Sequence, residues 1–210
     1  MVALYFGYMT FIDSQIGRLL TALDDLGLSE NTIVIHTTDH GDMIGSHGGH
    51  FNKGPLMYEE LYRVPLLIKV PDTSPRVIDD LVMTLDLMPT ILELAGCDTP
   101  GGLHGRSLAA TLDEEIGTEP EPRDSVFAEY HGEEWGLVSL RMVRTKTAKY
   151  VYSPHGEDEL YDLARDPFEK HNLADVAEAQ ELAHSLRSLV LRWMQQTSDP
   201  LAEWAARELP

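Results

Sequence analysis

The hydrophobic pattern at the start of the chain predicts a helix followed by a buried strand. Apolar side chains recur at three- and four-residue spacing over 3–27, where Gly27 is a natural stop. The recurring positions are Met9, Ile12, Ile16, Leu19, Leu20, Leu23 and Leu26. A β-branched run, "TIVIH" at 32–36, then suits a strand covered on both faces. Helix, short loop, buried strand and glycine-rich loop together indicate an α/β fold with a parallel sheet.

Three further elements are expected before an acidic stretch. "GPLMYEELYR" at 54–63 predicts a short helix opened by Pro55, because proline suits the first helical turn. "VPLLIKV" at 64–70 predicts a second strand. "TLDLMPTILELAGC" at 84–97 predicts a helix with Pro89 in or near its first turn.

The last third of the chain has a different pattern. Residues 113–124 are acidic, contain two prolines and lack an apolar period, so they predict a linker or exposed loop. The runs "SVFAEY", "LVSLRMVR" and "AKYVYS" predict an antiparallel meander, and a helix is expected near 175–196. We therefore expect an α/β domain over 1–112 and a small antiparallel-sheet and helix subdomain over 125–210.

Charge and composition exclude several classes of protein. The formal net charge of −19 over 210 residues opposes binding to nucleic acid or anionic membranes, which require a cationic surface. No apolar run is long enough for a membrane span, and the single cysteine, Cys97, rules out an internal disulfide. An anionic substrate would need a local cationic site that acts against this field.

Such a site is suggested just past the strand at 32–36. Asp39 and His40 can reach one cation only where the backbone leaves strand geometry, and Gly41 allows that turn. A carboxylate oxygen with an imidazole nitrogen suits a divalent metal, although two ligands are too few for a complete site. Lys53 adds a compact cation suited to a tetrahedral oxyanion such as sulfate or phosphate.

Other polar residues nearby are weaker candidates for a role in this site. Asp42, His47 and His50 are candidates for proton transfer or for holding the metal's ligands. His36 suits a packed core position, and Glu59 and Arg63 suit a structural ion pair. From residue types alone, the Asp-His-Gly could equally be an ordinary glycine-rich turn. No nucleophile motif or phosphate-binding glycine motif is present.

The order of these segments resembles the sulfatases of the alkaline-phosphatase-like superfamily. The region "TTDHGDMIGSHGGHFNKGPLMYEELYRVPLLIKVP" at 37–71 is similar to the family's second signature over its whole length. The helix segment before it, "IDSQIGRLLTALDDLGLSENTIV", also resembles the family. So do three later segments, in the family's order: "TLDLMPTILELAGC", "HGRSL" and "KYVYSPHGEDELYDLARDPFEKHNLAD". The resemblance implies that 1–112 is the C-terminal portion of a catalytic α/β domain of parallel-sheet sandwich type.

The resemblance also implies a site and a reaction. Asp39 and His40 match the later pair of metal ligands, with Ca²⁺ expected and Mn²⁺ or Mg²⁺ as alternatives. Lys53 matches the lysine that neutralises the sulfate group, and His47 is a candidate catalytic residue beside it. The implied substrate is a small-molecule or glycan sulfate ester, attacked by a formylglycine made from a cysteine or serine in a C-x-P-S-R-like motif.

The sequence departs from the family at that nucleophile. Cys97 is followed by "DTPGG", and the early pair of aspartates is also absent. We therefore expect the C-terminal half of a sulfatase, inactive alone and able to associate through an exposed sheet edge. A phosphonate or phosphate ester hydrolase of the same superfamily and a non-catalytic remnant are the alternatives. Localisation stays open, because any targeting segment would lie upstream of Met1.

Overall fold

A computed structural model describes residues 1–113, 116–118, 120–132 and 137–209. These residues form two compact units. Unit 1 comprises Met1–Asn52, Arg63–Asp79 and Met83–Glu121, and unit 2 comprises Lys53–Tyr62, Asp80–Val82 and Pro122–Pro210. The predicted division at 113–124 stays a prediction, and residues 114, 115 and 119 of that segment lie outside the described part.

Unit 1 begins with α1 (Val2–Asp25), which confirms the first predicted helix. Leu26 closes the helix, and Gly27 adopts the left-handed backbone (φ 67°) that glycine tolerates without steric cost. None of the residues of α1 is buried. Large apolar side chains along it remain exposed, including Leu4, Phe6, Tyr8, Met9, Phe11 and Leu19. The short 3₁₀ turn η1 (Ser29–Asn31) leads to the first strand.

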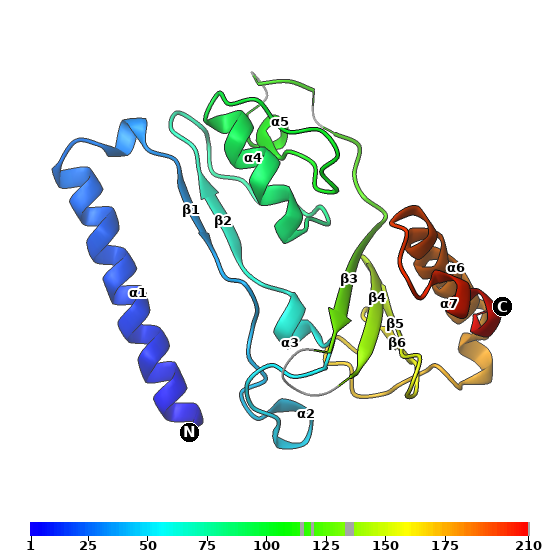
Figure 1. Cartoon of the computed structure of the whole chain (residues 1–210). Helices are drawn as coiled ribbons and strands as arrows, with labels where there is room; N and C mark the ends of the chain where they lie inside the picture. Colours follow the sequence, from blue (N-terminus) through cyan, green and yellow to red (C-terminus); the bar gives the residue numbers. More distant parts are fainter. Residues whose placement is uncertain (114–115, 119, 133–136, 210) are drawn as a thin grey trace. The chain divides into compact units, whose positions relative to one another are not determined.

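The strands of unit 1 form a two-stranded sheet. β1 (Val34–Thr37) pairs with β2 (Leu66–Lys69), with Val34 opposite Lys69 and Thr37 opposite Leu66 (Figure 1). Both predicted strands are confirmed, and their pairing is antiparallel. Within the described residues β1 has β2 as its one partner, so the parallel neighbours expected of it are not among these pairings. No strand in the described part of the chain pairs with the other edge of β1, which is thus an open sheet edge among these residues.

The predicted helix at 84–97 is also present. It starts as η2 (Thr84–Asp86) and continues as α4 (Leu87–Leu94), so Pro89 lies in the first turn of α4 as predicted. The buried Asp86 carboxylate accepts hydrogen bonds from the amides of Met83 (2.8 Å) and Arg106 (2.9 Å). This carboxylate joins the start of α4 to the segment that precedes α5 (Ala109–Leu112).

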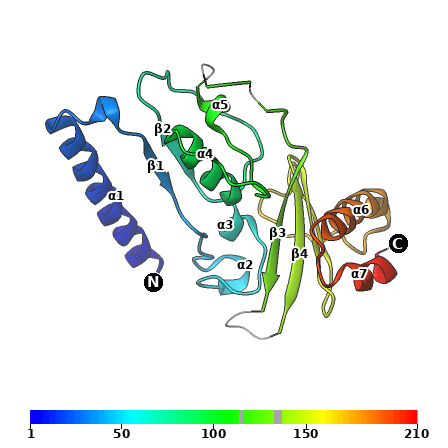
Figure 2. The ribbon, with the colours of Figure 1, turned by 45° about the horizontal axis from the view of Figure 1, so that its top comes forward.

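Unit 2 contains the predicted meander, with one strand more than expected. β3 (Ser125–His131), β4 (Ser139–Thr145), β5 (Ala148–Tyr152) and β6 (Glu159–Asp162) form an antiparallel sheet in chain order. The helix α6 (Gln180–Gln196) lies along one face of this sheet with α7 (Ala202–Glu208) beside it (Figures 1 and 2). Unit 2 also holds the short helix α3 (Glu59–Tyr62).

The core of unit 2 lies between the sheet and α6. Aromatic rings join the two layers, since Phe127 on β3 stacks on Trp193 of α6 with ring centroids 5.0 Å apart. Other apolar members of the core are Val143, Tyr150, Tyr152, Leu160, Leu186, Val190 and Met194. No helix among the described residues is long and apolar enough to cross a membrane.

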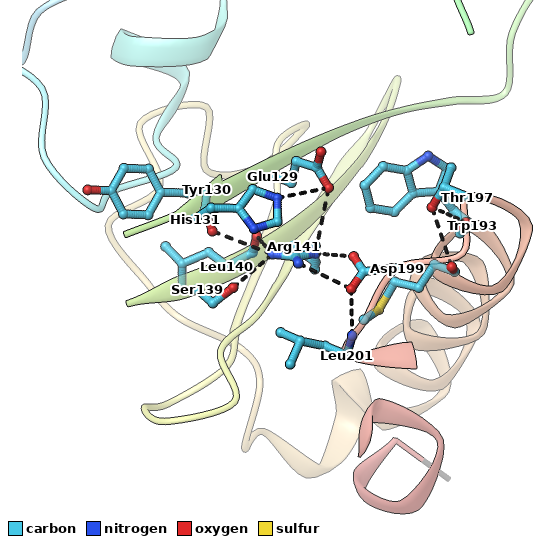
Figure 3. A network of polar contacts seen from close by, with 11 residues as sticks. Glu129, Tyr130, His131, Ser139, Leu140, Arg141, Trp193, Thr197, Asp199 and Leu201 are labelled. Atoms are coloured by element: carbon cyan, nitrogen blue, oxygen red, sulfur yellow. Dashed lines mark hydrogen bonds and ion pairs between the residues drawn. The ribbon is translucent and has the colours of Figure 1, made fainter. Parts of the chain in front are cut away.

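Two cations of the sheet are fully buried, Arg141 on β4 and Lys149 on β5. The guanidinium of Arg141 donates from Nε (2.5 Å) and Nη2 (3.2 Å) to the Asp199 carboxylate, which lies between α6 and α7 (Figure 3). Its Nη1 donates to the Leu140 carbonyl (2.8 Å) and to Ser139 Oγ (3.0 Å). Lys149 contacts the 53–62 segment and Glu169.

Candidate functional site

The backbone turns immediately after β1, and this turn brings Asp39 and His40 to the same side. The Asp39 carboxylate accepts hydrogen bonds from the amide of His40 (2.9 Å) and the hydroxyl of Thr38 (3.2 Å). The second carboxylate oxygen lies 3.7 Å from His40 Nε2. Both side chains reach solvent, with 84% of the Asp39 side chain and 39% of the His40 side chain exposed. A carboxylate and an imidazole nitrogen thus face one point beyond the strand end.

The second ring nitrogen of His40 fixes the orientation of the ring. Nδ1 lies 2.7 Å from the carbonyl oxygen of Gly41. Because a carbonyl can only accept, Nδ1 is the nitrogen that donates to Gly41, and Nε2 is the nitrogen that faces Asp39. The amide of His40 and then its ring lower the pKa of Asp39 below its ordinary value. With Nε2 deprotonated, the pair would offer a carboxylate oxygen and a nitrogen lone pair, which is the state that metal binding requires.

The glycine-rich loop after His40 is closed by its own polar groups. Asp42 Oδ1 accepts hydrogen bonds from the amides of Ile44 (2.9 Å) and Asn52 (3.1 Å), across ten residues of chain. Asp42 thus holds the loop through its backbone amides. His50 closes a tighter turn with its backbone, because its amide donates to the Ser46 carbonyl (3.0 Å) and its carbonyl accepts from Gly45 (2.6 Å).

His47 occupies a strained position at the tip of this loop. Its backbone is left-handed (φ 47°, ψ 50°) inside the short turn α2 (Ser46–Gly49). This conformation costs a non-glycine residue roughly 1–2 kcal/mol. Such strain is concentrated at functional sites, and no sequence pattern predicts it at a histidine. The flanking Gly48 also has a positive φ, of 86°.

Lys53 begins the 53–62 segment and is half-buried. This segment belongs to unit 2, whereas Asp39, His40 and His47 belong to unit 1. The ion pair expected between Glu59 and Arg63 is replaced by different partners. Glu59 contacts Arg144 (3.2 Å) and Lys149 (3.5 Å), because α3 places its carboxylate against β4 and β5.

The donor set at Asp39 and His40 fits part of a divalent-metal site. Oxygen and nitrogen donors without protons suit Ca²⁺, Mn²⁺ or Mg²⁺, with the oxygen preferred by the harder ions. In the part of the chain that the structure describes, no three His, Cys, Asp or Glu side chains converge. Asp39 and His40 would therefore need further ligands from outside these residues to complete a coordination sphere.

The family comparison matches this arrangement of segments. Residues 45–196 match the family model described as "N-sulphoglucosamine sulphohydrolase, C-terminal". The chain belongs to the sulfatase family. The sulfatase YidJ of Escherichia coli (strain K12) is 35% identical over 97% of this chain. An arylsulfatase of Clostridium perfringens is 36% identical over 90%, and an N-acetylglucosamine-6-O-sulfatase of Bacteroides thetaiotaomicron is 32% identical over 93%.

Solved structures show the same relationship for this sulfatase-family chain. A 2-O GAG sulfatase superimposes with a TM-score of 0.85 at 31% identity, over 94% of this chain and 43% of that one. A phosphonate monoester hydrolase of Agrobacterium radiobacter gives 0.78 at 28% identity, over 88% and 39%. The predicted fold class, of the alkaline-phosphatase-like superfamily, is confirmed. The chain spans 40%, 39% and 36% of the lengths of the three sulfatases named above.

Proposed function

We propose that this chain supplies the C-terminal part of a sulfuric ester hydrolase, with half of the metal site and the sulfate-binding lysine. The observation that carries the proposal is the Asp39–His40 pair, in which His40 Nε2 lies 3.7 Å from the Asp39 carboxylate while Nδ1 contacts the carbonyl of Gly41. Membership of the sulfatase family supports a hydrolytic role for this pair. A bound cation, most simply Ca²⁺, would neutralise charge on the oxygens of the ester group.

The roles of the chain's own residues follow from their chemistry. Asp39 and His40 bind the cation, and Lys53 binds the sulfate group through its three ammonium donors. His47 is proposed to give a proton to the leaving ester oxygen, because imidazole titrates near neutral pH. The strained backbone at His47 supports a positional role at the loop tip.

The attacking group is proposed to lie outside the chain. The sequence has no motif from which a formylglycine would form, and Asp39 and His40 are two ligands of a larger set. We therefore propose that the isolated chain does not turn over substrate. The substrate class is a small-molecule or glycan sulfate ester, which the named N-acetylglucosamine-6-O-sulfatase supports.

Metal binding is tested by titrating the purified chain with CaCl₂ in a calorimeter. With two protein ligands, the Kd is expected on the order of 1 mM or weaker. Asp39→Asn and His40→Ala should abolish this binding. Asp25→Asn removes one charge from an acidic surface elsewhere and should leave it intact. Equal binding by Asp39→Asn and Asp25→Asn would place the cation on the general acidic surface instead.

Catalysis is tested in a chimaera in which this chain replaces the matching segment of the E. coli relative. Hydrolysis of 4-nitrophenyl sulfate is expected, with kcat/KM lowered by about 100-fold or more in Lys53→Ala. Lys69→Ala, at an exposed lysine on β2, is the matched control and should not change it. Turnover by the chain alone would contradict the proposed incompleteness.

The same chimaera decides between the alternatives. A phosphonate monoester hydrolase is the second candidate, and the likeness to the Agrobacterium radiobacter enzyme is the observation in its favour. A higher kcat/KM on a phosphonate monoester than on the sulfate ester would support that activity. A folded chimaera without turnover on either ester would indicate a non-catalytic remnant.

A further inference from the structure

The segment that begins with Lys53 is held at two points of its backbone by buried charged side chains. Lys149 Nζ donates a hydrogen bond to the carbonyl of Met57 (2.6 Å). Glu169 Oε2 accepts one from the amide of Glu59 (2.7 Å). Both charged side chains are fully shielded from solvent. Residues about 90 and 110 positions away along the chain therefore fix backbone groups four and six residues after Lys53.

Lys149 and Glu169 also contact each other, and Glu59 and Arg144 complete a four-residue charged cluster. The ammonium of Lys149 forms an ion pair with Glu169 and lies 3.5 Å from the Glu59 carboxylate. Arg144 contacts the other oxygen of Glu59 (3.2 Å). Two cations and two carboxylates thus compensate each other within unit 2. Burial raises the pKa of Glu169, and the Lys149 ammonium opposes that rise.

Stability alone does not account for this cluster. Moving charges out of water is costly, and apolar side chains of similar volume are often as stabilising as a buried ion pair. Apolar side chains could not, however, donate to the Met57 carbonyl or accept from the Glu59 amide. Glu169 also has a left-handed backbone (φ 51°), which a non-glycine residue adopts at an energetic cost. The buried charges therefore cost stability, but they make two specific hydrogen bonds that fix the 53–62 backbone.

The link from these anchors to Lys53 is three residues long and includes a proline. Residues 54–56 separate Lys53 from Met57, and Pro55 among them has a fixed φ. The Met57 side chain is itself buried against Leu140, Met142 and Val151. Fixing the backbone at Met57 and Glu59 therefore restricts where the Lys53 ammonium can lie.

We propose that Lys149 and Glu169 are positioning residues for Lys53, which they serve by holding the 53–62 backbone in register. This inference rests on the proposed sulfate-binding role of Lys53. The competing explanation is that the apolar packing of Met57 alone orders the segment, and that the charges are incidental to it.

The test compares the whole 210-residue chain with Lys149→Met and with Arg141→Met as the matched control. Arg141 is the other fully buried cation of unit 2, and its contacts do not reach the 53–62 segment. Hydrogen–deuterium exchange is measured for peptides covering 53–62 and for peptides of α6. Lys149→Met is expected to raise exchange in 53–62 by about tenfold relative to Arg141→Met.

A second measurement reports on Lys53 itself. The chain has five lysines, so amine acylation of Lys53 can be followed by mass spectrometry with Lys69 and Lys146 as references. Inorganic sulfate is the probe, against chloride at equal ionic strength. The sulfate concentration that half-protects Lys53 should rise by about tenfold in Lys149→Met and stay unchanged in Arg141→Met.

The outcomes separate the two proposals. Equal exchange of 53–62 in Lys149→Met and Arg141→Met would overturn the positioning role. Absence of sulfate protection at Lys53 in the wild-type chain would overturn the sulfate-binding role, while the exchange data still decide positioning. If Lys149→Met does not fold, Glu169→Gln, which keeps the shape of the side chain, takes its place with the same expected directions.

Discussion

Arg141 and Asp199 form a buried, bidentate ion pair. The Nε and Nη2 atoms of Arg141 lie 2.5 and 3.2 Å from the two carboxylate oxygens of Asp199. Asp199 also accepts a hydrogen bond from the amide of Leu201 (2.8 Å), at the start of α7. One carboxylate thereby joins β4 to the turn between the last two helices. Glu129, 3.8 Å from the guanidinium, supplies a more distant second charge.

Loss of the Asp199 charge should strongly destabilise unit 2. Asp199→Asn leaves the buried Arg141 guanidinium without its close counter-charge, and we expect the free energy of unfolding to fall by about 3 kcal/mol. Urea unfolding followed by tryptophan fluorescence measures this, because Trp193 and Trp204 belong to unit 2. Arg165→Met, in a pair whose arginine is 89% exposed, should cost less than about 1 kcal/mol. A similar small loss in Asp199→Asn would contradict the prediction.

The Asp199 carboxylate should make the free energy of unfolding depend on pH in a defined way. Burial raises the pKa of Asp199, but the hydrogen bonds from Arg141 and from the Leu201 amide outweigh it and hold the pKa below the ordinary value of 3.8. A lowered folded-state pKa contributes stability that is fully present above pH 3.8 and is lost as pH falls through the folded pKa. The stability difference between wild type and Asp199→Asn should therefore be constant above about pH 5 and shrink below pH 3.8. A difference that grew on acidification would have the wrong sign.

The stacked rings of Phe127 and Trp193 should make a measurable contribution to the contact of α6 with the sheet. Phe127→Leu keeps an apolar side chain but removes the stacking, and we expect a loss of about 1 kcal/mol. The near-ultraviolet circular dichroism of the tryptophans should weaken in parallel. Phe168→Leu, at a ring that is 65% exposed, is the control and should change stability by less than about 0.5 kcal/mol. Equal effects of the two substitutions would show that the stacking contributes little.

The apolar surface of α1 should cause the isolated chain to associate. Phe6 and Phe11 are 60% and 58% exposed, on a helix without a buried residue. Sedimentation velocity should show species that grow with protein concentration, because such surface is normally covered. Phe6→Ser with Phe11→Ser should reduce this growth, whereas Gln15→Ala on the same helix should not. Growth that persists in the double variant would direct attention to the unpaired edge of β1.

Local patterns predicted the elements well where the signal lay within a few residues. Pro89 marked the first turn of α4, and the closely spaced β-branched and aromatic runs predicted the meander. The fourth strand, Glu159–Asp162, was not predicted, because its two apolar residues lie inside the charged stretch "GEDELYDLARD", which has no β-branched run. The antiparallel pairing of β1 with β2 depends on the path of the chain between them, which hydrophobic pattern does not encode.

Ion pairs between residues far apart in the chain could not be predicted from the sequence. Glu59 has Arg63 four residues away, the spacing of a helical ion pair, yet it contacts Arg144 and Lys149. Lys149 sits in "AKYVYS", where a lone lysine in a strand normally faces solvent. Every residue of β5 is instead buried, because the short sheet is covered on both faces at this strand. Only the fold brings Lys149 to Glu169.

The hydrogen bond between the His40 ring and the carbonyl of Gly41 bears on how the sequence orients the two proposed metal ligands. The ring is oriented by its immediate neighbour in the chain, and Asp39 is oriented by the amide of His40. Neither ligand depends on a side chain from a distant segment for its direction. The pair is therefore a portable unit of about four residues, which evolution or a designer could move to another strand end with its geometry intact.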